Sequence, residues 1–260
     1  MSSNNCTFRH GLHNKIGLLY TLLLSVSAIA GALLSTSVNP AWIWLHYLTK
    51  PTATALLVLW ILLIRAPVSM RYRNAIALGL AFAVGGDFFL MLPKDYFLAG
   101  LFCFLLTHCA YIYALCCDSV YISDIKNNQL ISKFIILRTV FIIFAVFIIF
   151  VVIALLAFIG LWNNLPNSMK MPVAIYAAIL AFMAGLAVNR AIIYPFKSPT
   201  PPAQHAANIA ALGGVFFAIS DSMLAYGRFY FETPLSPLLV LGTYYIAQWC
   251  FARSVLRSDQ

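Results

Sequence analysis

Apolar residues run through this chain in long stretches that short polar turns interrupt, and most stretches are about as long as a membrane-crossing helix. A helix needs about 20 mainly apolar residues to cross the hydrocarbon core of a bilayer. The pattern predicts eight spans, at residues 16–34, 51–64, 75–92, 96–117, 134–159, 171–189, 206–226 and 236–253. The second is short unless it extends, and the fifth is long enough to tilt. The predicted fold class is an all-α integral membrane protein with eight transmembrane helices.

Residues typical of turns separate the predicted spans. They stand at Asn39-Pro40, Lys50-Pro51, Pro93-Lys94-Asp95, Asn163-Asn164-Leu165-Pro166 and Ser198-Pro199-Thr200-Pro201-Pro202. Proline and asparagine favour turns, and proline cannot continue an ordinary helix. No polar stretch is long enough for a separate soluble domain, so residues 1–260 are expected to form a single membrane domain.

The composition agrees with a membrane protein. Of the 260 residues, 63% are hydrophobic and 9% are charged, and the mean hydropathy is +0.91. A soluble domain is nearer about 25% charged. The net charge is +9, but Lys and Arg are scattered over short loops, which argues against nucleic-acid binding. The six cysteines show no metal-binding spacing, so neither a zinc site nor a disulfide framework is expected.

Positive residues divide unevenly between the two ends of the predicted helices. The N-terminus, the even-numbered loops and the C-terminus carry twelve: Arg9, Lys15, Arg65, Arg71, Arg73, Lys126, Lys133, Arg138, Arg190, Lys197, Arg253 and Arg257. The other end carries Lys50, Lys94, Lys170 and Arg228. Because positive loops stay in the cytoplasm, both termini are expected there. A bacterial inner membrane is favoured, with the endoplasmic reticulum membrane as the alternative.

The chain also resembles itself at an offset of 134 residues. This offset aligns Asn74 with Asn208, Gly79 with Gly213, Asp87 with Asp221, Lys94 with Arg228, and Tyr111-Ile112 with Tyr245-Ile246. Four spans in each half give both halves the same orientation, which predicts two parallel four-helix repeats, at about 16–117 and 134–253. Chance alignment of apolar helices is the alternative, but the matches include Asp, Asn and Gly.

One aspartate lies inside each of two matching spans, Asp87 in the third and Asp221 in the seventh. A charge inside a bilayer is expensive and usually marks a functional site. Each aspartate precedes a cation at the end of its span by seven residues, which places it roughly 10 Å below the non-cytoplasmic rim. Two facing carboxylates in a low-dielectric site cannot both ionise cheaply. They are therefore expected to share a proton and to supply an acid and a base.

Other polar residues are candidates for binding a substrate. The cations Lys50, Lys94, Lys170 and Arg228 could hold a phosphate, although interfacial anchoring is the alternative and is preferred for Lys170. His108 lies in the middle of the fourth span and either orients a ligand or bonds a neighbouring helix. Further interior candidates are Tyr111, Tyr176, Tyr244, Tyr245 and Gln248, and each also fits ordinary packing. Small residues beside the acids, Gly85, Gly86, Ser220 and Ser222, allow either access of water or close helix contacts.

These residues also resemble a known family. The matching pieces are Lys50-Pro51; Gly86-Asp87 with Leu90; Phe97, Gly100, Leu101, Phe104, Leu105, His108 and Tyr111; Tyr176 with Met183; Ser220-Asp221 with Leu224, Ala225, Arg228 and Phe229; and Tyr244-Tyr245 with Gln248. In this order and spacing they resemble the lysoplasmalogenase family of multi-pass membrane proteins, the YhhN-like family, from about residue 16 to 253. The long fifth span and the proline-rich sixth loop depart from the family pattern.

The resemblance implies hydrolysis of the vinyl ether bond of lysoplasmenylethanolamine or lysoplasmenylcholine, which releases a fatty aldehyde and glycerophosphoethanolamine or glycerophosphocholine. Asp87 and Asp221 would be the catalytic pair: the protonated member protonates carbon, and the ionised member stabilises the resulting cation and deprotonates water. No metal or organic cofactor is required. Substrate binding would fall to the outer cations Lys50, Lys94 and Arg228, with His108, Tyr111, Tyr176, Tyr245 and Gln248 as further candidates.

Three other functions remain open from the residues alone. A proton-coupled transporter would use the same acid pair, although no helices are obviously broken at matching positions. An intramembrane aspartyl protease is disfavoured, because Val84, Gly85 and Gly86 before Asp87 do not form its GxGD motif. A non-catalytic lipid-binding protein or scaffold would use the acids structurally. The expected partners are a lysophospholipid and the bilayer, with no nucleic acid. Headgroup preference and oligomeric state stay open.

Overall fold

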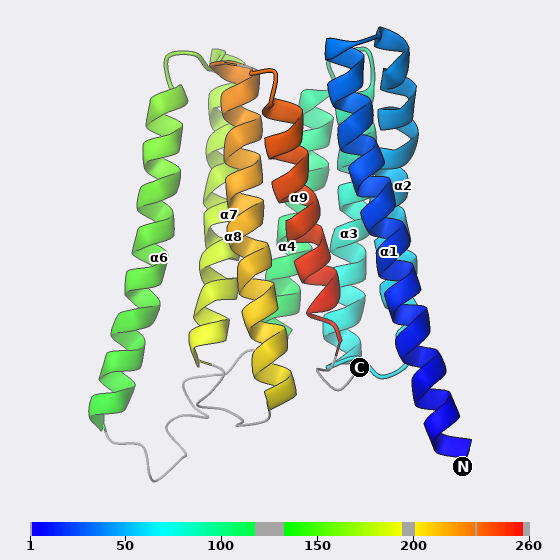
Figure 1. The fold of residues 1–260 in the computed structure, drawn as a ribbon. Helices are drawn as coiled ribbons and strands as arrows, with labels where there is room; N and C mark the ends of the chain where they lie inside the picture. Colours follow the sequence, from blue (N-terminus) through cyan, green and yellow to red (C-terminus); the bar gives the residue numbers. More distant parts are fainter. Residues whose placement is uncertain (1, 118–132, 194–200, 232, 257–260) are drawn as a thin grey trace.

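A computed structural model of the chain describes residues 2–117, 133–193, 201–231 and 233–256, and these residues are almost entirely helical (Figure 1). The long helices in these ranges are α1 (Ser2–Ser37), α2 (Ile43–Leu62), α3 (Met70–Met91), α4 (Phe97–Cys117), α6 (Lys133–Leu161), α7 (Asn167–Ile193), α8 (Pro201–Phe229) and α9 (Ser236–Arg253). A short 3-10 helix, η1 (Pro40–Trp42), joins α1 to α2. This confirms the predicted all-α class.

Within the described ranges, seven of these helices are long and apolar enough to cross a bilayer, and α9 is the exception. Helix α9 has 18 residues and coincides with the predicted eighth span. Its polar side chains Tyr244, Tyr245 and Gln248 are buried inside the bundle. Polar side chains are tolerated at membrane depth when protein surrounds them. The lower apolarity of α9 thus follows from its place beside α8 and α1.

The predicted break at Lys50-Pro51 is wrong, because Pro51 lies inside α2. Proline removes one backbone donor from a helix, but membrane helices tolerate it where side chains and neighbouring helices satisfy the carbonyls. On α2 the carbonyl that Pro51 leaves without its backbone donor is that of Tyr47, and the helix nevertheless continues through this turn to Leu62, packed between α1 and α3. The second span is therefore 20 residues long and begins eight residues earlier than predicted.

Neighbouring helices pack in the same order in both halves of the chain. Helices α1 to α4 pack successively on one another, and α6 to α9 do the same. The halves meet where α4 packs on α7 and where α9 packs on α1, α2 and α3. Under the predicted repeat, the contact of α4 with α7 corresponds to that of α9 with α2. The two-repeat organisation itself stays a prediction.

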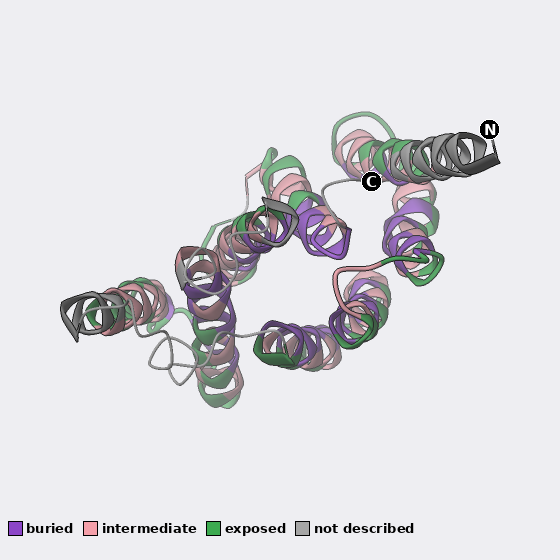
Figure 2. Ribbon diagram, turned by 90° about the horizontal axis from the view of Figure 1, so that it is seen from below, coloured by how far each residue is buried: buried purple, intermediate pink, exposed green. Residues whose placement is uncertain are grey.

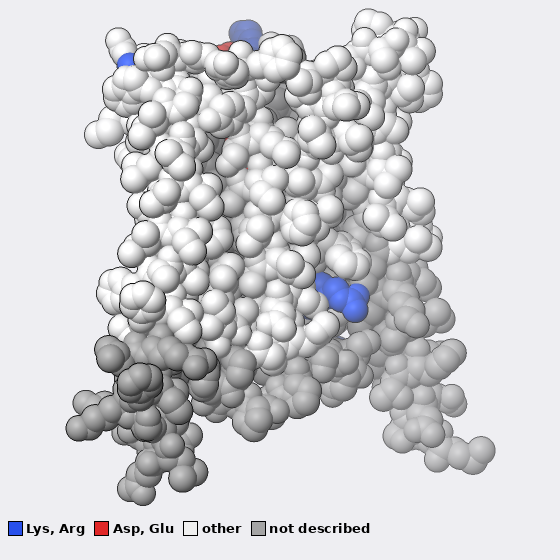
Figure 3. Space-filling model, turned by 60° about the vertical axis from the view of Figure 1, so that its left-hand side comes forward, with Lys and Arg blue, Asp and Glu red and all other residues white. Residues whose placement is uncertain are grey.

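The bundle is elongated across the membrane plane and has an apolar outer surface. Seen from below, α6 stands at one end and α1 at the other, while buried residues face the interior (Figure 2). The face in Figure 3 is uncharged over most of the described height, with charged groups at the upper end and one basic group lower down. Such a surface suits contact with lipid.

The two ends of the bundle differ as the charge pattern predicts. Helix α1 begins and α9 ends at the lower end in Figure 1. Lys94, in the turn between α3 and α4, and Lys170, in the first turn of α7, lie at the opposite end. Lys126, Lys197, Arg257 and most of the predicted break at 198–202 lie outside the described residues. Which end faces the cytoplasm stays a prediction.

Glycine brings α3 and α4 close together beside the candidate site. A Cβ atom on Gly86 would lie 2.6 Å from Cε2 of Phe104, which is too close for any side chain there. Small residues allow such close approach in membrane helices. At Gly86, the structure therefore favours the close-contact reading of the small residues over access of water.

Candidate active site

The first candidate aspartate, Asp87 on α3, lies in a buried cluster with groups from two other helices. Its Oδ2 accepts a hydrogen bond from the Tyr244 hydroxyl on α9 at 2.7 Å and another from the Thr54 hydroxyl on α2 at 2.9 Å. Nζ of Lys50, also on α2, lies 3.4 Å from Oδ1. Asp87 and Lys50 are both buried. Since a buried charge must be paired and hydrogen-bonded, this cluster fits an ionised carboxylate.

The partners of Asp87 on α2 lie on one face of that helix. His46, Lys50 and Thr54 are spaced four residues apart, which places their side chains above one another. Nδ1 of His46 lies 3.0 Å from the Ala28 carbonyl on α1. Because a carbonyl oxygen only accepts, that nitrogen carries a proton. This face of α2 forms a polar stripe from the end of the bundle down to Asp87.

The second candidate aspartate, Asp221 on α8, has different partners, on α4 and α7. The Tyr176 hydroxyl on α7 donates a hydrogen bond to Oδ2. Nε2 of His108 on α4 lies 3.2 Å from the same oxygen and 2.9 Å from the Tyr176 hydroxyl. All three residues are buried. Under the predicted repeat, the helices that hold Asp221 correspond to those that hold Asp87, but the residue types differ.

Phe217 packs against both clusters. Its ring centroid lies 5.9 Å from that of Tyr244 and 4.7 Å from that of His108. Among the described residues no hydrogen bond or ion pair joins Asp87 to Asp221, because each carboxylate has its own donors. The structure therefore offers no contact through which the two would share a proton directly.

A cavity of about 490 Å³, here called the rim cavity, lies at the end of the bundle opposite the start of α1. Lys50, Lys94 and Arg228 line it, together with His46 and Asp95. Ammonium and guanidinium groups gathered in this way suit a phosphate. Lys50 contributes both to this cavity and to the ion pair with Asp87, so it joins the rim to the buried acid.

Two of the four outer cations also contact other side chains at this end of the bundle. The Arg228 guanidinium already pairs with the exposed Asp95 carboxylate and lies 5.4 Å from the Phe97 ring centroid. Lys170 is not among the described residues that line the cavity, and its Nζ lies 4.2 Å over the Trp162 ring. Interfacial anchoring, the alternative preferred for Lys170 from the sequence, stays a prediction.

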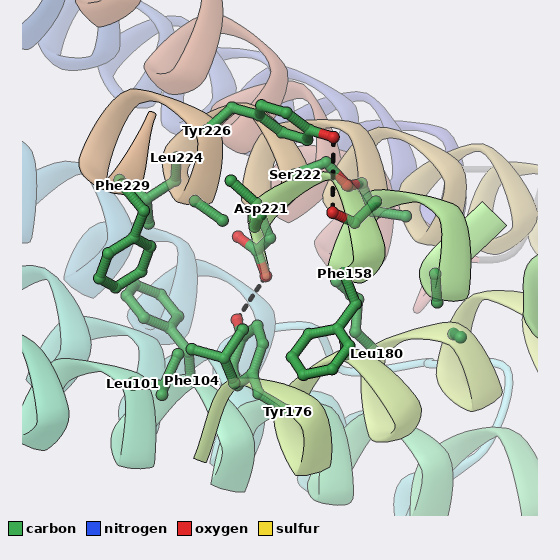
Figure 4. Close-up of a pocket in the computed structure, with 18 of the residues that line it drawn as sticks. Leu101, Phe104, Phe158, Tyr176, Leu180, Asp221, Ser222, Leu224, Tyr226 and Phe229 are labelled. Atoms are coloured by element: carbon green, nitrogen blue, oxygen red, sulfur yellow. Dashed lines mark hydrogen bonds between the residues drawn. The ribbon is translucent and has the colours of Figure 1, made fainter. Parts of the chain in front are cut away.

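A second, smaller cavity of about 90 Å³, here called the apolar cavity, lies among α4, α6, α7 and α8. Its walls are almost entirely aliphatic and aromatic, and Asp221 and Tyr176 meet within them (Figure 4). Figure 4 shows one oxygen of Asp221 bonded to Tyr176 and the other turned away from it. A carboxyl oxygen without that bond is available to a molecule in the cavity.

The two cavities adjoin. Leu90, Phe97 and Leu224 line both of them. A cationic space and an apolar space thus meet one helical turn from each aspartate. This arrangement can hold an amphiphile with its anionic part at the rim and its apolar part beside Asp221.

Three predicted binding residues lie elsewhere. The Tyr111 hydroxyl donates to Oε1 of Gln248 at 2.6 Å, and both residues are fully buried. The Tyr245 hydroxyl is buried and has no hydrogen-bond partner among the described residues. None of the three is among the described residues that line either cavity. The geometry therefore favours packing for these residues.

Thr54 and Tyr244 are the partners of Asp87 that the predicted site lacks. Thr54 lies one turn after Lys50 on the same helical face, and this spacing was available in the sequence. Tyr244 was an interior candidate, but nothing in the sequence distinguishes it from the adjacent Tyr245. The rotation of α9 decides between the two, and packing sets that rotation.

The fold and the site together define a multi-pass integral membrane protein with buried acidic residues beside an amphiphilic cavity. Comparison with known sequences agrees with this class. The sequence model of the YhhN family matches residues 45–255, so the chain belongs to the YhhN family. The match begins within α2, and therefore α1 lies outside it, although the resemblance was expected to begin near residue 16.

Several similar proteins carry names that state an activity. The protein named lysoplasmalogenase TMEM86A from Homo sapiens is 27% identical over 186 residues, which cover 71% of this chain and 66% of that protein. Its counterpart from Bos taurus is 28% identical over 192 residues, with the same coverage. Lysoplasmalogenase TMEM86B from Rattus norvegicus is 33% identical over 97 residues, or 36% of this chain and 34% of that protein. The chain thus spans just under two thirds of the TMEM86A proteins. No solved structure matches.

Proposed function

We propose that this protein hydrolyses the vinyl ether bond of lysoplasmalogens and releases a fatty aldehyde and a glycerophosphoethanolamine or glycerophosphocholine. The names of the similar proteins motivate the proposal. The observation that carries it is the meeting of the rim cavity and the apolar cavity beside Asp221. A lysophospholipid has one anionic headgroup and one hydrocarbon chain, and these cavities match both parts.

The headgroup phosphate would lie in the rim cavity with Lys50, Lys94 and Arg228. We expect that end of the bundle to lie on the non-cytoplasmic side and both termini in the cytoplasm, because loops rich in Lys and Arg tend to stay in the cytoplasm. The glycerol would then pass Leu90 and Leu224, which bring the vinyl ether to the level of Asp221. Binding of the phosphate and of the chain at separate places fixes the position of the reacting bond.

Asp221 is the proposed acid, in its protonated form. The oxygen turned away from Tyr176 would transfer its proton to the vinyl carbon remote from the ether oxygen, and the carbon next to that oxygen becomes an oxocarbenium ion. Tyr176, which donates to Oδ2, stabilises the negative charge that develops on the carboxylate. His108, within 3.2 Å of the same oxygen, orients it.

The rest of the reaction restores the acid. Water adds to the oxocarbenium carbon and gives its proton to the Asp221 carboxylate, which forms a hemiacetal. The bond between the hemiacetal carbon and the glycerol oxygen then breaks. The hemiacetal hydroxyl loses its proton and the glycerol oxygen gains one. The products are the fatty aldehyde and glycerophosphoethanolamine or glycerophosphocholine. This assigns to Asp221 both steps that the sequence divided between two aspartates.

Asp87 has a different proposed role. It stays ionised beside Lys50, with Thr54 and Tyr244 as donors. Its carboxylate would hold the Lys50 ammonium at the floor of the rim cavity, where the ammonium meets the phosphate. Asp87 is then a positioning residue for substrate binding.

The test is aldehyde release from lysoplasmenylethanolamine and lysoplasmenylcholine by detergent-purified protein, with an ester-linked lysophospholipid as the control. We expect aldehyde from the vinyl ether lipids, no ester cleavage, and no aldehyde from a folded Asp221→Asn protein. Folded wild-type protein that turns over none of these lipids would overturn the proposal. A proton-flux assay in liposomes would then test the transporter alternative.

A further inference from the structure

The apolar cavity is too small for a whole lipid chain. Its volume of about 90 Å³ is smaller than the roughly 150 Å³ of an engineered protein cavity that binds a single benzene molecule. It reaches from Phe229 and Leu161, near the end of the bundle, past Asp221 and Tyr176 to Ala181, which lies five residues beyond Tyr176 on α7. If the vinyl ether lies at Asp221, most of the chain beyond it must leave the cavity.

Helix α6 forms the wall of the apolar cavity that faces the lipid. It contributes Phe150, Ile153, Ala154, Ala157, Phe158 and Leu161. Of its described residues 140–160, none is buried, and α6 stands at one end of the bundle (Figure 2). The wall between the cavity and the bilayer is therefore a single peripheral helix.

The two halves of α6 are attached differently. In its lower half, Phe147 stacks on Phe182 of α7 with ring centroids 5.3 Å apart. There Nδ2 of Asn189 also donates to the Ile143 carbonyl at 3.2 Å. In its upper half, the polar contact shown in Figure 4 is a long hydrogen bond of 3.4 Å from the Tyr226 hydroxyl to a carbonyl of α6, that of Ala157.

Separation of the upper half from α8 would thus break little polar bonding. The other contacts there are apolar, and lipid tails can replace apolar side chains with little loss of free energy, because both are equally apolar. The lower contacts would keep α6 attached. This geometry makes the seam between α6 and α8 the weakest side of the apolar cavity.

We propose that the hydrocarbon chain of the substrate leaves the apolar cavity between the upper half of α6 and α8 and continues into the bilayer. Ala154 and Ala157 would set the width of this lateral passage, and so they would determine which chains are accepted. The aldehyde product would return to the bilayer by the same passage. The inference rests on the proposed hydrolase function and adds the path of the chain.

The first experiment compares two substrates, a long-chain lysoplasmalogen and a short-chain analogue whose alkenyl chain ends within the apolar cavity. Ala154→Phe and Ala157→Phe should lower kcat/KM for the long chain about tenfold more than for the short chain, because only the long chain has to pass between α6 and α8. Leu155→Phe is the matched control, because Leu155 lies on the same turn of α6 with 53% of its surface exposed. This variant should treat both substrates as the wild type does.

The proposed passage would be overturned if Ala154→Phe and Ala157→Phe lowered kcat/KM equally for the long and the short substrate. It would also be overturned if Leu155→Phe lowered kcat/KM for the long substrate as much as the two alanine variants do. Either result would leave the hydrolase function intact. Lack of turnover of either substrate by the wild type would instead overturn the function. A second measurement does not depend on turnover or on the variants. A non-hydrolysable alkyl ether lysophospholipid with a photoreactive group at its chain end should label α6 between Phe150 and Phe158, or the facing part of α8. Labelling confined to α3 or α4 would contradict the proposed path.

Discussion

Leu90 and Leu224 occupy the same position relative to their aspartates, and both line both cavities. Each lies three residues after its acid, Asp87 or Asp221, on the same helical face. The place where the cavities meet is therefore one turn above both carboxylates. The side chains around the two carboxylates nevertheless differ, so the two aspartates are expected to have different roles.

The two aspartates should differ in kinetics. Asp221→Asn should lower kcat by about 10²–10⁴-fold, because an amide cannot supply the proton. Asp87→Asn should act mainly on KM, because it releases Lys50 from the floor of the rim cavity. Steady-state aldehyde release by folded protein measures both effects. Equal losses of kcat in the two variants would argue for the joint acid pair expected from the sequence.

Two buried tyrosines provide a matched comparison. Tyr176→Phe removes the donor to Asp221 and should lower kcat about ten- to a hundredfold. Tyr111→Phe removes the donor to Gln248 and should lower the free energy of unfolding by about 1–3 kcal/mol without changing kcat of the folded enzyme. If the folded Tyr111→Phe protein lost turnover, Tyr111 would be a member of the active site, as the sequence predicted, and not a packing residue.

Substitutions of Lys50 and Asp87 should have coupled effects on the free energy of unfolding, because the two residues form a buried ion pair. Either Lys50→Met or Asp87→Asn leaves the partner buried without its counter-charge, which should lower the free energy of unfolding by about 3–5 kcal/mol. The double variant should lose less than the sum of the single losses. Denaturant unfolding in micelles measures this. Strict additivity would mean that the pair contributes no coupling.

Substitution of the outer cations should raise KM only where the cation lines the rim cavity. Lys94→Gln and Arg228→Gln should each raise KM several-fold at nearly constant kcat, and the effect should shrink as salt increases. Lys170→Gln is the control, since Lys170 stacks on Trp162 and is not among the described residues lining the rim cavity. If Lys170→Gln raised KM as much as the other two variants, the effects would come from the general surface charge and not from phosphate binding in the rim cavity.

Two helical glycines should respond oppositely to alanine. Gly86→Ala would place Cβ 2.6 Å from Phe104 and should lower the free energy of unfolding by about 1–3 kcal/mol. At Gly242 nothing lies within 4 Å of the added Cβ, so Gly242→Ala should be neutral or stabilising by up to about 1 kcal/mol. Thermal unfolding in one detergent compares them, and equal changes would contradict the packing described for Gly86.

The helices and the acids could be predicted from the chain because their signals are local. Apolar length gave the spans, and the rarity of Asp inside them marked Asp87 and Asp221. The prediction at Pro51 is wrong because the local preference of proline for a turn is overridden by the packing of α2 against α1 and α3. Contacts with neighbouring helices, which allow proline inside a membrane helix, cannot be predicted from the local sequence.

The partners of the acids could not be predicted in the same way. Whether Tyr244 or Tyr245 faces Asp87 depends on the rotation of α9, which side chains from several helices decide together. The separation of the two carboxylates likewise depends on Phe217, which looks in the sequence like any other apolar residue. The repeat predicts equal depth for the two acids, but it does not predict which side chains contact each of them.

The hydrogen bond from Tyr244 to Asp87 also has a consequence for biogenesis. Asp87 enters the membrane with α3, but its donor follows later in the chain, on α9. Until then the carboxylate has only its partners on α2. Because α9 is the one long helix in the described ranges that is not apolar enough to cross a bilayer by itself, its insertion depends on the helices already in place. Insertion of α9 is therefore the step that gives the Asp87 carboxylate its third partner, and the buried cluster is complete only then.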